Sequence, residues 1–190
     1  IADDEELDAY VNGAKAYISA QDGNRTTLTV GYSVPVASGV HGQVVSFCDG
    51  SDVTVSLFAD GSAESKYTVS VPGGTKDSSG QYTTTYDIPE VAPGTYTMRV
   101  SKKNHVTREY TVTVSGDAVT QDVKIHLMGD INGDGRISIG DINQANLHAK
   151  GKKILLGYEL ACADINGDGR VTTSDVNKMN LHNKGKSLLW

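Results

Sequence analysis

Apolar and polar residues alternate with a period of two along most of the chain, from about Lys15 to Leu127. This period places every second side chain on the same face of an extended strand. The alternating stretches are rich in Val, Thr and Tyr, which favour strands. The candidate strands are Arg25–Val34, Gly42–Phe47, Asp52–Phe58, Lys66–Val71, Gln81–Ile88, Gly94–Ser101, Thr107–Val114 and Gln121–Leu127. Regularly spaced short strands without helices between them predict an antiparallel β-sandwich.

Turn-forming residues separate the candidate strands, as in Asp60-Gly61, Pro72-Gly73-Gly74 and Ser115-Gly116-Asp117. Residues 1–14 are acidic and small, and we interpret them as a linker or short helix. The sequence therefore predicts a first domain that spans residues 1–127.

The last third of the chain is a duplication. Asp130-Ile-Asn-Gly-Asp-Gly-Arg-Ile137 recurs 34 residues later as Asp164-Ile-Asn-Gly-Asp-Gly-Arg-Val171. A stretch with helical periodicity follows each copy and ends near Gly151 or Gly185, where glycine is a natural C-cap residue. Residues 128–190 are thus predicted to form a small all-α domain of two loop–helix units.

Each copy contains the oxygen ligands of a twelve-residue calcium loop. Such a loop binds Ca²⁺ through positions 1, 3, 5, 7, 9 and 12, with position 7 using its carbonyl and position 9 a water molecule. The predicted ligands of the first ion are Asp130, Asn132, Asp134, Arg136, Ser138 and Asp141; those of the second are Asp164, Asn166, Asp168, Arg170, Thr172 and Asp175. Gly135 and Gly169 stand at position 6, where the chain turns sharply. Ordinary turns without a metal would not require the same six ligand positions to recur in both copies, so we expect each loop to bind one Ca²⁺ ion.

The helix that follows each loop has two different faces. At 100° per residue, the inward positions are Ile142, Ala145 and Ala149 in one copy, and Val176, Met179 and Asn183 in the other. Leu147 and Leu181 point outward, and identical polar neighbours flank them. An apolar residue that recurs on the outer face favours a partner surface over packing on the sandwich or scattered surface leucines.

The loop–helix units resemble a dockerin, in which two calcium repeats lack the first helix of an EF-hand and carry Asp at position 12. The resemblance covers about Met128–Trp190 and implies binding to a cohesin domain in a bacterial cellulosome. It also implies partner contacts at loop positions 10 and 11 and on the exposed helix face. The corresponding residues are Ile139, Gly140, Asn143, Asn146, Leu147 and Lys150, with Thr173, Ser174, Asn177, Asn180, Leu181 and Lys184 in the second copy. Thr173-Ser174 is similar to the hydroxyl pair of clostridial dockerins, whereas Ile139-Gly140 departs from it.

The segment Val91–Asp117 resembles carboxypeptidase-regulatory-like and other immunoglobulin-like modules, which often start a hairpin with Pro-Gly-Thr-Tyr. A β-module directly before a dockerin is similar to the X-modules of dockerin-bearing proteins. Only Met128-Gly129 separates the last candidate strand from the first calcium ligand. A linker this short predicts that sandwich and dockerin behave as one rigid body.

Composition and motifs narrow the function further. The net charge is −6, much of the acidity lies in the calcium loops, and no basic tract favours nucleic acid. No apolar run approaches the ~18 residues of a membrane span. Motifs of hydrolases, metalloproteases and phosphate-binding loops are absent, so we do not expect this chain to be an enzyme. Cys48 and Cys162 are predicted to be free thiols.

The sequence therefore predicts a non-catalytic, calcium-dependent adaptor that binds a cohesin and anchors its parent protein in an extracellular, bacterial cell-surface complex. The parent is expected to be longer, because the chain starts at Ile1 without a signal peptide, and it can be a glycoside hydrolase. Two alternatives stay open: a carbohydrate-binding sandwich that the dockerin anchors, and a free-standing calcium sensor. The sensor is disfavoured because its Met-rich groove is lacking.

Overall fold

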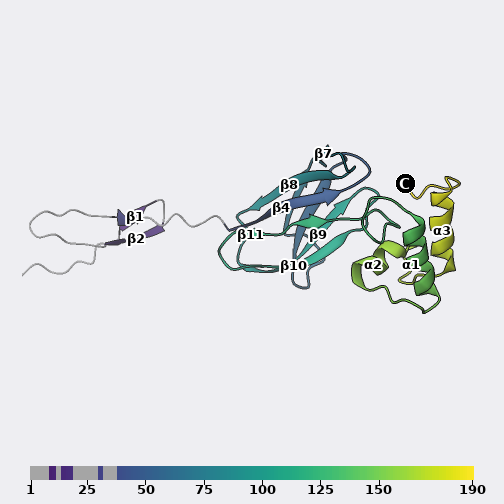
Figure 1. Ribbon diagram of the computed structural model, residues 1–190. Coiled ribbons are helices and arrows are strands. Elements are labelled where there is room, and N and C mark those ends of the chain that lie inside the picture. The colour runs from purple at the N-terminus through teal and green to yellow at the C-terminus, as the bar shows by residue number, and fades with distance from the viewer. Residues whose placement is uncertain (1–8, 12–13, 19–29, 32–37) are drawn as a thin grey trace, which may run out of the picture. The chain divides into compact units, whose positions relative to one another are not determined.

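A computed structural model describes residues 9–11, 14–18, 30–31 and 38–190 (Figure 1). The chain divides into two compact units, residues 1–36 and 37–190. In the first unit, strands β1 (Ala9–Val11), β2 (Ala14–Ile18) and β3 (Val30–Gly31) form an antiparallel sheet in the order β1-β2-β3. The predicted linker at 1–14 and the predicted strand Arg25–Val34 lie largely outside the described residues.

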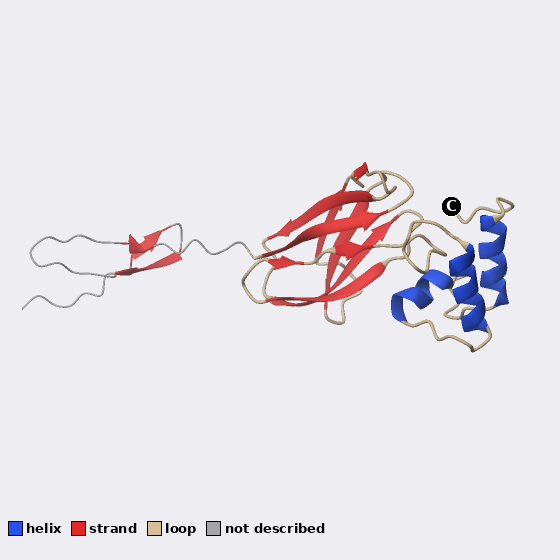
Figure 2. Ribbon diagram, in the orientation of Figure 1, coloured by secondary structure: helices blue, strands red, loops and turns tan. Residues whose placement is uncertain are grey.

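The second unit begins with a β-sandwich, as predicted (Figure 2). One sheet has the order β10-β9-β5-β6, and the other contains β11, β4, β8 and β7, with β12 also paired to β4. The strands of the first sheet are β5 (Val53–Ala59), β6 (Tyr67–Val71), β9 (Gly94–Lys102) and β10 (Arg108–Val114). Those of the second are β4 (Gly39–Ser46), β7 (Thr75–Lys76), β8 (Tyr82–Pro89), β11 (Val119–Thr120) and β12 (Val123–Lys124).

Alternate residues of these strands form the core between the two sheets. In β5, Val53, Val55 and Leu57 are fully buried while the residues between them are partly exposed. They meet Val40 and Val44 of β4 in one cluster that also contains Tyr86 and Met98. The period of two in the sequence is thus the period of burial in the sandwich.

One sheet differs from the expected antiparallel pattern. The predicted strand Gln121–Leu127 is represented only by β12, and β11 and β12 both pair parallel with β4. Between them, the carbonyl of Gln121 lies so close to Gly42 that a Cβ there would come within 2.3 Å of its oxygen. A glycine on β4 is therefore required where the segment between β11 and β12 passes close to this strand.

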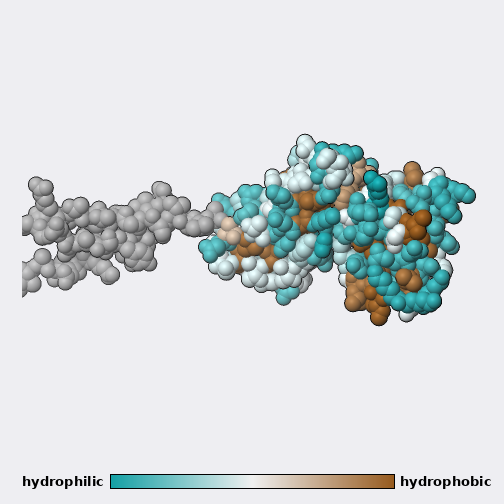
Figure 3. All heavy atoms as spheres, in the orientation of Figure 1, coloured by the Kyte–Doolittle hydropathy of each residue, from teal (hydrophilic) through white to brown (hydrophobic). Residues whose placement is uncertain are grey.

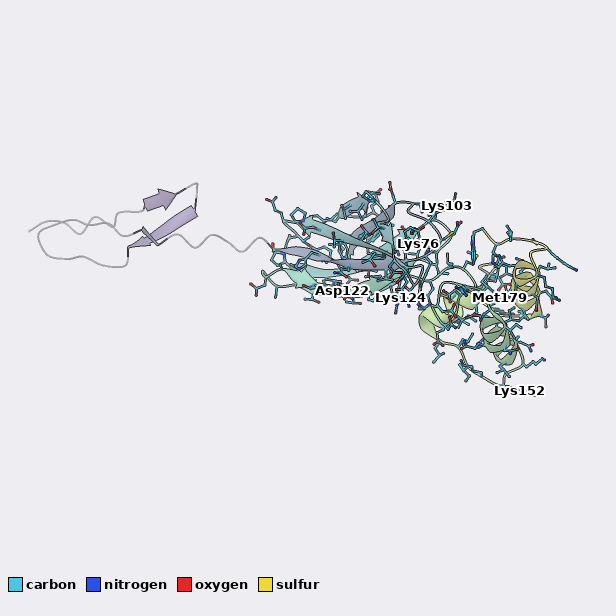
Figure 4. All side chains as sticks on the ribbon, turned by 45° about the horizontal axis from the view of Figure 1, so that its top comes forward. Lys76, Lys103, Asp122, Lys124, Lys152 and Met179 are labelled. Carbon is cyan, nitrogen blue, oxygen red and sulfur yellow. The ribbon has the colours of Figure 1, made fainter. Side chains whose placement is uncertain are left out.

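The helical region follows with α1 (Ile139–Ala149), α2 (Gly157–Ala163) and α3 (Thr173–Asn183). Helices α1 and α3 each begin with a capping box and end before Gly151 or Gly185, whose φ angles are 66° and 63°. These glycine caps were predicted. Figure 4 shows Met179 among the helices, where it is fully buried against Ala145 and Ile142. The prediction that Asn183 points inward is wrong, because Asn183 is the last residue of α3 and is exposed.

The sequence did not predict α2, which joins the helical region to the sandwich. The hydroxyl of Tyr158 accepts a hydrogen bond from His126 N (2.9 Å) and donates one to the Val106 carbonyl (2.7 Å). Gly129 N donates to the carbonyl of Cys162 (2.8 Å). The two residues between the domains, Met128 and Gly129, are therefore fixed to the helical region by a hydrogen bond to α2. On the sandwich side, Met128 N donates to the Asn104 carbonyl (3.0 Å).

Candidate calcium loops and partner surface

The carboxylate of the first residue in each loop accepts hydrogen bonds from the backbone N–H groups of the loop. Asp130 accepts hydrogen bonds from Gly133 N (2.8 Å), Asp134 N (3.1 Å) and Gly135 N (2.8 Å). The second loop repeats the arrangement at Asp164, with distances of 2.8, 3.3 and 2.7 Å. Both position-6 glycines have positive φ, 87° at Gly135 and 82° at Gly169, as the predicted sharp turn requires.

The position-12 carboxylate closes each loop onto its helix. Asp141 Oδ1 accepts from Ile131 N and Asn132 N, both at 3.1 Å, while Oδ2 accepts from Ser138 N and its hydroxyl. Asp175 makes the same four contacts with the equivalent atoms of the second loop. Asp at position 12 thus links the start of the loop to the N-terminus of the helix.

The residues of the loops fit a calcium ion. Burial raises the pKa of Asp130 to about 6, and the charge of Asp141 adds to this effect, against the lowering by the backbone N–H groups. A carboxylate that is buried without a cation is costly, and a divalent cation removes this cost. The other predicted side-chain ligands are carboxylates, amides and hydroxyls, the oxygen donors that Ca²⁺ prefers. Carboxylate oxygens that accept N–H groups keep further lone pairs for a metal.

Across residues 38–190 and the three short strands before them, no three His, Cys, Asp or Glu side chains form a metal-ligand cluster. Three of the six predicted ligands in each loop are Asp carboxylates, at positions 1, 5 and 12, and the others are amide, hydroxyl and carbonyl oxygens. The histidines of the two repeats serve another purpose. His148 Nδ1 accepts from Leu155 N (2.9 Å) and His182 Nδ1 from Leu189 N (3.0 Å), which folds each tail back on its helix.

The two loops lie in different environments. In the first, the rings of His126 and Phe47 lie against Gly133 and Gly135, and Asp130 is fully buried. In the second, no atoms of other residues lie within 4 Å of where a Cβ would stand on Gly167 or Gly169. Only the first loop is therefore covered by the sandwich.

The predicted partner residues lie on the outer faces of α1 and α3. Ile139 is 67% exposed, and Leu147 and Leu181 are 40% and 41% exposed, so the recurring leucines point outward as the helical period predicts. Brown apolar atoms interrupt the polar surface of the helical region in Figure 3. The other exposed members of the predicted set are Gly140, Asn143, Lys150, Thr173, Ser174, Asn177 and Lys184; Asn146 and Asn180 are half-buried.

A groove of about 440 Å³ lies along the α3 face. Its lining is Asn177, Asn180, Leu181, Lys184 and Lys186, four of which belong to the predicted partner set. One amide is already used within the helix, because Asn180 Nδ2 donates to the Val176 carbonyl (2.9 Å). The groove offers an apolar centre with amide and ammonium donors around it, and its lining carries no carboxylate.

The family described as the dockerin type I domain matches residues 128–182. The C-terminal region is therefore a dockerin domain, preceded by the β-sandwich that the sequence predicted. No curated protein matches the chain.

Two solved structures similar to the chain are an N-terminal and a C-terminal interface mutant of a type II cohesin-X-dockerin complex from Acetivibrio cellulolyticus. They are 21% and 20% identical, and each match covers 76% of this chain and 94% of the other chain. Both TM-scores are 0.34, which is a weak structural likeness.

Sequence reasoning missed the residues that join the sandwich to the dockerin: Phe47, Val106, His126 and Tyr158. Their contacts bridge long separations, such as the 32 residues between His126 and Tyr158. One signal was available for α2, since Leu155, Tyr158 and Cys162 have helical spacing. The position of Phe47 against the first loop follows only from the tertiary fold.

Proposed function

We propose that this chain is a non-catalytic, calcium-dependent adaptor whose dockerin binds a cohesin domain. The observation that carries the proposal is the dockerin family match over two loop–helix units whose outer faces repeat. Each of the two loops binds one Ca²⁺ through the residues predicted from the sequence, and binding is coupled to folding because it neutralises converging carboxylates. The sandwich stabilises the dockerin through α2 and the first loop.

The same proposal extends to the parent protein. The adaptor anchors it in an extracellular cellulosome-type complex or on the bacterial cell surface, and the parent can be a glycoside hydrolase or another polysaccharide-degrading enzyme. No helix among the described residues has the length and apolar character needed to cross a membrane. The anchor we propose is the cohesin.

The test is a binding screen of the full chain against a panel of cohesins, with calcium and with a chelator. We expect tight binding to at least one cohesin in calcium and none in chelator. Binding that is equal in both conditions would contradict calcium dependence, and no binding to any cohesin of types I and II would contradict the adaptor.

Substitutions at the two leucines locate the surface. A charge buried at an interface without a partner costs several kcal/mol, so Leu147→Asp with Leu181→Asp should abolish cohesin binding. If each single variant keeps substantial binding, the dockerin docks in two orientations; if one abolishes binding alone, it docks in one. Leu188→Asp is the control, because Leu188 is 68% exposed and lies outside the predicted faces. Normal binding by the double variant would exclude these faces.

A second candidate function is glycan binding by the sandwich, and a groove of about 670 Å³ favours it. Its lining includes the hydrogen-bonding residues His41, Gln43, Thr85, Asp87 and Asp122, and its volume suits a small ligand. Pull-down of the full chain on insoluble cellulose and xylan tests this function. Retention that Asp87→Ala abolishes would support it, and free passage of the wild-type chain would exclude both glycans as ligands.

A further inference from the structure

The first calcium loop is supported by two rings that belong to the sandwich. A methyl group built at Gly133 would lie 2.3 Å from His126 Nε2, and one at Gly135 would lie 2.4 Å from Phe47 Cδ1. Such distances mean that the rings already touch the backbone of the loop. Gly167 and Gly169, at the same positions of the second loop, have no such neighbours.

Both rings are held by contacts of their own. Phe47 is 3% exposed, and its backbone N–H donates to His105 Nε2 at 3.0 Å. The main chain of His126 is bonded on both sides, to the Tyr158 hydroxyl through its N–H and to Val106 N through its carbonyl (2.9 Å each). The His126 ring also packs edge-on against the ring of Tyr158, with centroids 5.1 Å apart. The main chain that carries each ring is therefore fixed close to the loop, and the His126 ring would lose its packing on Tyr158 if it moved away.

The rings touch the segment on which the Asp130 contacts depend. Gly133, Asp134 and Gly135 donate their N–H groups to that carboxylate. If this segment moved outward, the carboxylate would lose three donors and would no longer be fixed for a metal. The rings oppose this movement in the first loop, whereas no ring lies against the corresponding glycines of the second loop.

We propose that Phe47 and His126 are positioning residues for the first calcium site, and that they make this site release its ion more slowly than the second. The inference rests on the proposed function, because it requires calcium in both loops. It assigns to the sandwich a specific effect on one ion, beyond a general stabilisation of the dockerin.

The test is stopped-flow release of calcium from the full chain into a fluorescent chelator. We expect two phases of equal amplitude in the wild type. Asp164→Ala should remove the fast phase and leave the slow one, which assigns the slow phase to the first loop. Phe47→Ala and His126→Ala should each accelerate the slow phase roughly tenfold and leave the fast phase unchanged, so the second loop is an internal control.

Variants separate positioning from folding. Phe58→Ala is the matched control, since Phe58, on β5, is the other phenylalanine of the chain and its ring contacts Arg99 of β9. It should change neither phase. Phe47→Leu keeps an apolar side chain and should restore most of the slow release. If circular dichroism shows that Phe47→Ala does not fold, Phe47→Leu and His126→Ala carry the test, with a smaller acceleration expected for Phe47→Leu.

Three results would overturn the inference: a single release phase for two ions, a slow phase that Phe47→Ala and His126→Ala leave unchanged, or equal acceleration of both phases. Wild-type chain that binds no calcium would overturn the proposed calcium dependence and the inference together. Two bound ions with unaltered release rates in the variants would overturn the inference alone.

Discussion

The two predicted calcium loops have identical residues at nearly every predicted ligand position and differ in what surrounds them. Asp130 is fully buried and its loop lies against the sandwich, whereas Asp164 is half-buried and its loop is open around both glycines. The internal hydrogen bonds of the two loops match to within a few tenths of an ångström. A duplicated sequence thus gives two similar loops, and the neighbouring domain makes them unequal.

The same inequality extends to the proposed partner surface. Leu147 and Leu181 are almost equally exposed, but the first residue of each helix differs, with Ile139 in α1 and Thr173 in α3. The sandwich also lies against only one of the two loops. A cohesin that docks in two orientations would therefore meet the sandwich differently in each, and the leucine variants distinguish these cases.

Removal of the position-1 carboxylate should have the largest effect. Asp130→Ala leaves three backbone N–H groups without an acceptor in a buried site, and we expect a loss of about 3–5 kcal/mol in the free energy of unfolding of the helical region in calcium. Asp164→Ala should cost about half as much, because water reaches the second loop. The double variant should leave the helical region unfolded.

Denaturant unfolding in saturating calcium, followed by far-UV circular dichroism, measures these differences. Asp117→Ala, at an exposed turn of the sandwich, is the control and should change little. Equal losses for the two single variants would contradict the unequal environments. A calcium-free dockerin that melts cooperatively at the temperature of the calcium-bound form would contradict the coupling of metal binding to folding.

Matched glycine substitutions should have the next largest effect. Gly133 and Gly167 have φ angles of 72° and 71°, so alanine introduces the same backbone strain of about 1 kcal/mol at either position. Only Gly133→Ala also collides with His126, which should add about 1–3 kcal/mol. Thermal unfolding of the two variants measures the difference. The double variant Gly133→Ala with His126→Ala should recover the added cost, and its failure to do so would exclude the ring as the cause.

Acidification should weaken the support of the first loop. Burial lowers the pKa of His105 from 6.5 to about 4, and the charge of Lys102 lowers it further, against a bond to the Lys103 carbonyl. The unfolded chain therefore takes up the proton first, and stability is lost as the pH falls from 6.5 towards 4. Protonation also removes the acceptor of Phe47 N.

We expect a loss of about 2 kcal/mol between pH ~7 and ~5 from this group. Unfolding of the sandwich at several pH values measures it, and the slope should flatten in His105→Gln. His41→Gln, at a histidine that contacts Thr120, is the control and should keep the wild-type slope. An unchanged slope in His105→Gln would show that another group is responsible.

Local patterns predicted most of the elements and the make-up of the loops. The strands from β4 to β10 follow from alternation, with the exception of the two-residue β7, and the C-terminal ends of α1 and α3 follow from the two glycine caps. The N-caps Ser138 and Thr172 were predicted only as calcium ligands. Helix α2 was missed because it is only seven residues long, begins at Gly157 and has no side-chain cap. It is stabilised by tertiary contacts instead.

The inequality of the loops could not be predicted from the sequence. It depends on Phe47, which lies 88 residues before Gly135, and on His126, which lies 7 residues before Gly133. Both residues belong to segments with strand-like patterns. Alternation shows which face of a strand is buried but does not show which loop another domain will cover. The ligand set and the partner residues thus stay predictions from the repeat, and only the tertiary fold distinguishes the two copies.

Amide hydrogen exchange in the calcium-saturated full chain tests the central claim most directly, because each loop is the control for the other. The N–H groups of Gly133, Asp134 and Gly135 should exchange at least about tenfold more slowly than those of Gly167, Asp168 and Gly169. The Phe47→Ala and His126→Ala variants should reduce that difference. Equal protection of the two loops in the wild type, or greater protection of the second, would contradict the claim that the sandwich supports the first loop alone.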